Sequence, residues 1–138
     1  MSQFKNFPTK LKLFKDEADF QSWFSGYITD QYWWIAQHKL SDQSMSKKPC
    51  DYFFVNEVGQ TVWCELKVIP GFTININRFE PQQVEFLTHL TSLYRQWLPR
   101  YSLAYAVLYS KKNQEVRYLP WDEIQQQLLE TGSLKVFE

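Results

Sequence analysis

Apolar residues repeat with helical spacing in two long segments of the chain. The first segment covers residues 16–36, and Asp16 is a residue type that caps the N-terminus of a helix. Its repeating positions are Phe20, Phe24, Tyr27, Ile28, Gln31 and Ile35. The second segment covers residues 80–97, where Pro81 is compatible with a first helical turn. Its repeating positions are Val84, Leu87, Leu90, Tyr94 and Trp97. The pattern predicts two amphipathic helices.

Shorter runs of β-branched and aromatic residues predict strands. The runs DYFFV and TVWCELKV are separated by NEVGQ, in which Gly59 can take the positive φ of a tight connection. Both runs are apolar on both faces, as expected for a central sheet covered by helices. Residues 102–110 and 115–120 predict a second strand pair joined by the turn KKNQ, and a last helix is predicted to begin near Trp121.

The remaining segments are interpreted as connections. Residues 38–49 are polar and interrupted by Ser and Pro, which favours a loop. Residues 70–79 predict a loop with a short edge strand, and residues 1–15 predict a basic tail that can be flexible. The expected fold is a single α/β domain over residues 1–138, with a central mixed β-sheet flanked by helices.

Composition narrows the class of protein. The 138 residues are 44% hydrophobic and 18% aromatic, which is enough for one core and too little for two ordinary domains. Cys50 and Cys64 form no CxxC pair, so buried free thiols and a reducing cytoplasm are expected. No segment approaches the ~18 apolar residues of a membrane helix, so no membrane partner is expected. Only four glycines occur and none forms a phosphate-binding loop, so a nucleotide cofactor is not expected.

The formal net charge of zero argues mildly against a general nucleic-acid coat protein, because binding to phosphates depends on Lys and Arg. Local basic clusters are still candidates for DNA contact. Two such pairs are Lys47 with Lys48 and Lys111 with Lys112. Each pair has the alternative interpretation of a solvated surface.

Three ionisable residues fall on the predicted hairpin. Glu65 and Lys67 lie two positions apart on a strand and therefore point to the same face. If paired residue numbers sum to 116, Asp51 lies opposite Glu65, and if they sum to 118 it lies opposite Lys67. A register slip of one residue would move Asp51 to the other face.

Two neighbouring carboxylates repel each other but suit a hard divalent cation such as Mg²⁺. Such an ion polarises a phosphoryl oxygen, and Lys67 can orient a nucleophile or stabilise developing charge. This combination predicts phosphodiester hydrolysis. In the alternative interpretation, Glu65 and Lys67 form an exposed salt bridge and Asp51 merely begins a strand.

These residues resemble the PD-(D/E)xK nucleases, specifically RecU-type Holliday junction resolvases and their phage relatives. The resemblance runs from about His38 to Asp122 and includes KPCDYFFV, TVWCELKV, FTININRFEPQQVEFL and LAYAVLYSKKNQEVRYLPWDEI. It implies a restriction-endonuclease-like core and a Mg²⁺- or Mn²⁺-dependent DNA endonuclease that acts in DNA recombination on branched DNA as a homodimer.

The resemblance also implies roles for individual residues. Asp51 and Glu65 would bind the metal, the backbone carbonyl of Leu66 would add a ligand, and Lys67 would be the catalytic lysine. Gln83 would support the site, with an exposed helical residue as the alternative. Glu17 would add a metal ligand, with a favourable charge at the helix N-terminus as the alternative. The alternative function is a non-catalytic DNA-binding or protein-interaction module of a mobile element that retains the nuclease fold.

Overall fold

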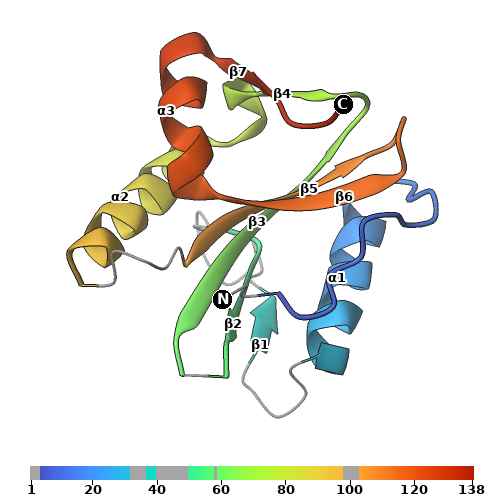
Figure 1. Ribbon diagram of the computed structural model, residues 1–138, viewed down its shortest axis with the longest axis horizontal. Coiled ribbons are helices and arrows are strands. Elements are labelled where there is room, and N and C mark those ends of the chain that lie inside the picture. The colour runs from blue at the N-terminus through green and yellow to red at the C-terminus, as the bar shows by residue number, and fades with distance from the viewer. Residues whose placement is uncertain (1–3, 32–36, 40–49, 58, 98–102) are drawn as a thin grey trace.

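The computed structural model describes residues 4–31, 37–39, 50–57, 59–97 and 103–138. Its central sheet has five strands in the order β1-β2-β3-β5-β6 (Figure 1). These strands are β1 (Gln37–Lys39), β2 (Tyr52–Val55), β3 (Thr61–Ile69), β5 (Ala104–Ser110) and β6 (Glu115–Pro120). Strand β3 is parallel to β5, whereas the other neighbouring pairs are antiparallel, so the sheet is mixed as predicted.

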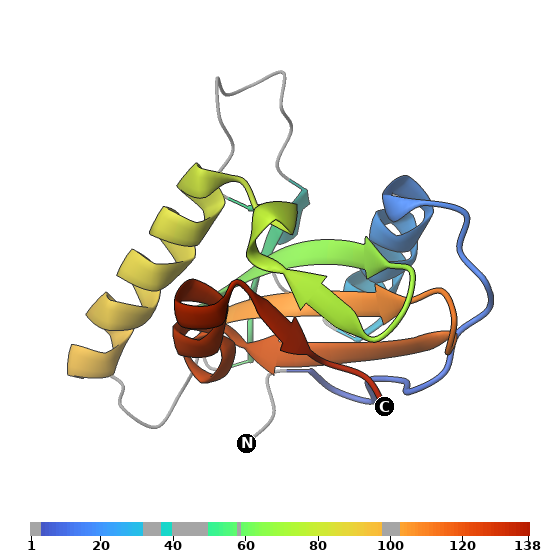
Figure 2. The ribbon, with the colours of Figure 1, turned by 90° about the horizontal axis from the view of Figure 1, so that it is seen from above.

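Helices cover both faces of this sheet. They are α1 (Glu17–Gln31), α2 (Pro81–Trp97) and α3 (Trp121–Thr131). Helix α1 packs on one face, and α2 and α3 pack on the other (Figure 2). The α1 core contains Phe20 and Phe24 with Leu66, while the α2–α3 core contains Leu87 and Trp121. The predicted α/β class, with helices flanking a central mixed sheet, is therefore confirmed.

The helix boundaries follow from local chemistry. Asp16 Oδ1 accepts a hydrogen bond from the Asp19 backbone N–H at 3.0 Å, which confirms the predicted cap of α1. The predicted continuation of this helix over residues 32–36 lies outside the described residues. Helices α2 and α3 begin at Pro81 and Trp121, within one residue of their predicted positions. None of the helices in the described ranges is long and apolar enough to cross a membrane.

The N-terminal segment corrects one expectation. Residues 4–15 do not form a free basic tail, because they run beside β6 and are tied to it. The Leu11 N–H donates to the Gln114 carbonyl at 2.9 Å, and the Val116 N–H donates to the Thr9 carbonyl at 3.0 Å. Phe4 and Phe14 are buried in the α1 core. The burial of these two rings holds the segment in place, while its lysines remain at least partly exposed.

Two short strands differ from the predicted pattern. Strand β4 (Thr73–Asn75) pairs with β7 (Ser133–Lys135) in a separate sheet instead of forming an edge of the central one. A 3₁₀ turn, η1 (Ile76–Arg78), connects β4 to the segment before α2. Strand β1 lies partly within the segment predicted as a loop. Three-residue strands are too short to show the alternation by which a strand is recognised.

Candidate active site

The β2–β3 hairpin adopts the first of the two registers considered above. Its paired residues run from Tyr52 with Cys64 to Val55 with Thr61, so their numbers sum to 116. Continued by one step, this register places Asp51 opposite Glu65. The Asp51 N–H donates to the Cys64 carbonyl at 3.2 Å, which holds Asp51 against β3 just before β2 begins, and its carboxylate lies close enough to Glu65 to raise the pKa of that group. The hairpin therefore brings the two carboxylates together.

After Cys64, β3 has a described strand partner on one side only. This partner is β5, which pairs with β3 as far as Ile69. We call the other side of residues 65–69 the open edge. The Leu66 N–H on this edge donates to Asp51 Oδ2 at 2.9 Å, and the Val68 N–H donates to Glu17 Oε1 at 3.3 Å. Carboxylates thus occupy the position that a neighbouring strand would take.

Glu65 is fully buried, with no solvent-exposed surface. In the described part of the chain, neither oxygen of its carboxylate has a hydrogen bond of good geometry. Lys67 Nζ lies 3.0 Å from Glu65 Oε2 and forms an ion pair with it by distance. Burial raises the pKa of Glu65 well above its usual range, and the negative charge of Asp51 raises it further, whereas Lys67 lowers it. Lys67 therefore compensates the buried charge only in part, because burial and Asp51 outweigh it.

Lys67 lies on the same face of β3 as Glu65. Its side chain is 12% exposed, and its Nζ is 5.8 Å from the centre of the Phe79 ring. Most of the side chain is therefore covered, while solvent still reaches part of it. The salt bridge of the alternative interpretation is formed, but it is not an exposed one, because its glutamate is completely buried.

Gln83 is buried, with 2% of its surface exposed, which rules out the alternative of an exposed helical residue. Its Oε1 accepts a hydrogen bond from the Glu80 N–H at 3.1 Å. Glu80 immediately precedes α2, so Gln83 supplies the side-chain contact that a capping box provides at the third helical position. Its observed contact thus stabilises the beginning of α2.

Replacing Gln83 with Ala is expected to destabilise the protein by about 0.5–2 kcal/mol, because the Glu80 N–H loses its acceptor. Gln83→Glu should retain most of the stability, since glutamate also serves in a capping box. Urea unfolding followed by circular dichroism measures both changes. Gln82→Ala is the control, because that side chain is partly exposed on the same turn and contacts the Glu80 carboxylate instead of its backbone N–H. Equal losses in the Gln82 and Gln83 variants would contradict the capping role.

Glu17 pairs with an arginine, whereas the resemblance implies that it adds a metal ligand. Its Oε1 accepts a hydrogen bond from Arg78 Nη2 at 2.7 Å, as well as the one from Val68. Among the residues that the structure describes, no three His, Cys, Asp or Glu side chains gather closely enough to hold a metal ion. The structure therefore brings Asp51 and Glu65 together with Lys67, and it pairs Glu17 with Arg78.

Arg78 is the residue of this region that sequence reasoning missed. It is an isolated basic residue in η1, and its partner Glu17 lies 61 positions earlier in the chain. No local pattern connects the two residues. Arg78 lies between the E-x-K triplet at residues 65–67 and Gln83. This position is the only feature of the sequence that points to it.

The predicted basic contacts fall partly within the described residues. Lys111 and Lys112 form the turn between β5 and β6, where their backbone N–H groups donate to the carbonyls of Ile69 and Pro70 at 2.9 and 3.2 Å. The turn therefore lies beside the end of β3 that carries the open edge. Lys47 and Lys48 lie outside the described residues.

No protein-family model and no curated protein matches the chain. Among solved structures, the fold is similar to that of Hjc, a Holliday junction resolvase from the archaeal hyperthermophile Archaeoglobus fulgidus. That similarity has a TM-score of 0.45 and 19% sequence identity, and it covers 72% of this chain and 74% of Hjc. The function proposed for this chain therefore rests on the geometry of its own side chains.

Proposed function

We propose that this protein is a Mg²⁺- or Mn²⁺-dependent endonuclease that hydrolyses phosphodiester bonds in DNA. The observation that carries the proposal is the buried pair of Asp51 and Glu65 next to the lysine Lys67. Two carboxylates with one lysine, placed on the two strands of a hairpin, provide the groups that metal-assisted phosphodiester hydrolysis requires.

The donor set fits a hard divalent cation. The two oxygens of Glu65 are buried without hydrogen bonds in the described part of the chain, and Asp51 adds a second carboxylate. Within a strand, the N–H and C=O groups of one residue point to the same side. The Leu66 N–H points to the open edge, so the Leu66 carbonyl points there as well. Oxygen donors of this kind are those that Mg²⁺ and Mn²⁺ prefer. When bound, such an ion supplies Lewis-acid polarisation of a phosphoryl oxygen.

The residues around the ion would have separate roles in binding, orientation and charge stabilisation. The Leu66 N–H orients the Asp51 carboxylate through a 2.9 Å hydrogen bond. Burial keeps water away from Glu65 and strengthens its electrostatic interactions. The Lys67 side chain keeps 12% of its surface exposed, and its ammonium group can donate hydrogen bonds to a phosphate and stabilise the charge that develops during hydrolysis.

DNA is supported as the substrate by the basic turn of Lys111 and Lys112 beside the end of β3. Positive side chains at the end of the strand that carries Glu65 would attract the negative backbone of DNA to this side of the protein. Selectivity for branched DNA and assembly as a homodimer stay predictions of this proposal. Light scattering measures the assembly, and the substrate panel described next measures the selectivity.

The wild-type protein with Mg²⁺ or Mn²⁺ is expected to cut at least one of four labelled DNA substrates. The substrates are a linear duplex, a single strand, a flap and a four-way junction, and the products are separated on denaturing gels. Chelation with EDTA should stop cleavage, because the carboxylate pair depends on the ion to act on phosphate. If all four substrates stay intact with either metal, the enzyme proposal fails and a non-catalytic DNA-binding or interaction module is favoured.

A further inference from the structure

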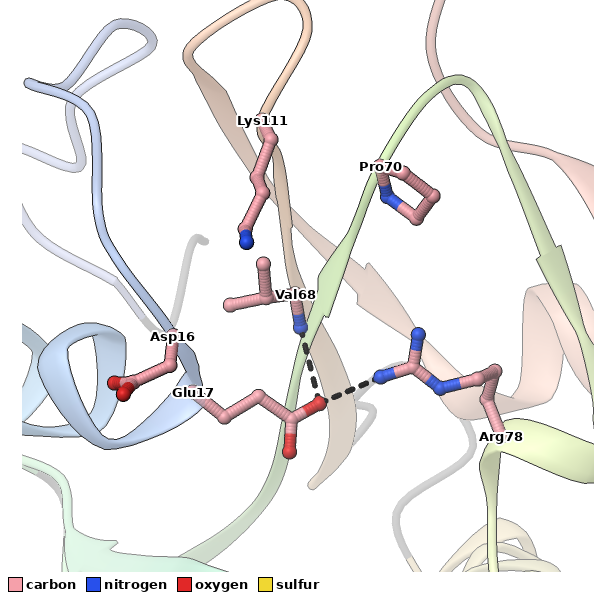
Figure 3. A pocket seen from close by; sticks show the side chains of 6 residues that line it. All are labelled: Asp16, Glu17, Val68, Pro70, Arg78 and Lys111. Carbon is pink, nitrogen blue, oxygen red and sulfur yellow. Dashed lines mark hydrogen bonds and ion pairs between the residues drawn. The ribbon is translucent and has the colours of Figure 1, made fainter.

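A pocket of about 290 Å³ lies beside the open edge of β3, and its lining includes none of Asp51, Glu65 and Lys67. Its lining residues come from the start of α1, the end of β3, η1 and the β5–β6 turn (Figure 3). They are Asp16, Glu17, Val68, Pro70, Arg78 and Lys111. Segments that are far apart in the sequence thus meet at one hollow of the surface.

The guanidinium of Arg78 is held in a defined place in this pocket. Nη2 donates to Glu17 Oε1 at 2.7 Å, and the same oxygen accepts the Val68 N–H at 3.3 Å. Figure 3 shows the other terminal nitrogen of Arg78 pointing away from Glu17, toward the side where Pro70 lies. A guanidinium has five N–H donors in a planar fork, so a contact with Glu17 leaves donors for a ligand.

The two carboxylates and two cations that line the pocket cancel in formal charge, so the case for an anion rests on the donors of Arg78 and Lys111 that point into it. The Asp16 carboxylate is engaged as the cap of α1, and the Glu17 carboxylate is engaged by Arg78 and Val68. Lys111 is exposed, and within the described residues no carboxylate lies within 4.0 Å of its ammonium group. Two cations from different elements therefore face one small pocket. A guanidinium fork and an ammonium group together match the oxygens of a phosphate.

The position of the pocket identifies the kind of phosphate. Asp51 is bonded to the N–H of Leu66, and Glu17 is bonded to the N–H of Val68, two residues farther along β3. This step along a strand is about 7 Å. It is similar to the separation of successive phosphates along one DNA strand. A strand that places one phosphate at the catalytic set can therefore place its neighbour at Arg78.

We propose that this pocket binds the DNA backbone phosphate next to the one that is cleaved, through Arg78 and Lys111. The inference rests on the proposed nuclease function and adds to it a phosphate-binding subsite. The subsite contacts the backbone and not the bases, so it contributes affinity and strand position without sequence preference.

The test measures binding of a fluorescein-labelled oligothymidylate by anisotropy at several NaCl concentrations, with Ca²⁺ in place of Mg²⁺. Wild type is compared with Arg78→Gln and Lys111→Gln. Each variant should weaken binding and reduce the magnitude of the slope of log K against log salt by about 0.7, which corresponds to one lost phosphate contact on a single strand.

Lys5→Gln is the matched control, because it removes one positive charge at the opposite end of β3, where Lys5 pairs with Glu57 in the β2–β3 turn. Its salt slope should equal that of the wild type. The inference is overturned if both pocket variants keep the wild-type slope, or if the control changes it equally. When the wild type cuts DNA in Mg²⁺ but the slopes stay equal, only the subsite fails. When the wild type neither binds nor cuts DNA, the nuclease proposal fails as well.

Discussion

Asp51→Asn, Glu65→Gln and Lys67→Ala are each expected to lower the rate of metal-dependent DNA cleavage by about 10²–10³-fold or more. The two carboxylate variants remove a negative donor from the pair that faces the ion, and an amide oxygen replaces it poorly. The lysine variant removes the only ammonium group for which the described residues show an ion pair with Glu65. In the described residues, no neighbouring group replaces the side chain that each change removes.

Single-turnover cleavage of the best substrate in the panel measures this loss, and circular dichroism shows that each variant is folded. Glu57→Gln and Lys5→Gln are the charge-matched controls, because both residues lie at the far end of the hairpin. They should cleave at the wild-type rate. Retained activity in any two of the three site variants would disprove the assignment of the site.

Glu65→Gln is also expected to stabilise the metal-free protein at neutral pH, by about 1 kcal/mol or more. Burial and the charge of Asp51 raise the pKa of Glu65 in the folded protein above its value in the unfolded chain, which is about 4.3. The folded state therefore holds this proton more tightly than the unfolded state. Its contribution to stability is complete below the unfolded pKa and is lost as the pH rises through the folded pKa.

Glutamine cannot ionise, so the variant avoids the loss that the wild type suffers as the pH rises. Thermal unfolding in EDTA should show the largest gain in stability near neutral pH, and the gain should shrink as the pH approaches about 4.3. Added Mn²⁺ should reverse the order, because it stabilises the wild type by about 2.7 kcal/mol at a concentration 100 times its dissociation constant. A variant that is less stable than the wild type at every pH in EDTA would contradict this account of Glu65.

The sequence allowed the central part of the site to be predicted because that part is local. Asp51 and Glu65 belong to one hairpin with a short connection, so only a few registers are possible and strand alternation restricts the faces. The structure selects the register in which the two residues are opposite. The long helix α2 was predictable for a similar reason, since its apolar positions repeat over several turns.

The parts that could not be predicted depend on contacts between distant segments. The N-terminal segment has lysines that suggest a solvated tail, yet Phe4 and Phe14 hold it against the sheet. The pairing of β4 with β7 joins three-residue strands that are separated by most of the second half of the chain. Arg78 meets Glu17 only because η1 and the start of α1 fold toward the same end of β3. Such contacts leave no periodic signal in the sequence.

The bonds from the Leu66 and Val68 N–H groups to Asp51 and Glu17 also occupy the donors through which the open edge could pair with a strand of another molecule. An unpaired strand edge offers its N–H and C=O groups to a strand from another molecule, which is a route to aggregation. Here two negative side chains occupy the donors and repel an approaching backbone carbonyl. The choice of substitution at Asp51 therefore affects solubility as well as cleavage. Asparagine keeps an oxygen acceptor for the Leu66 N–H, whereas alanine would leave that donor open to a second chain.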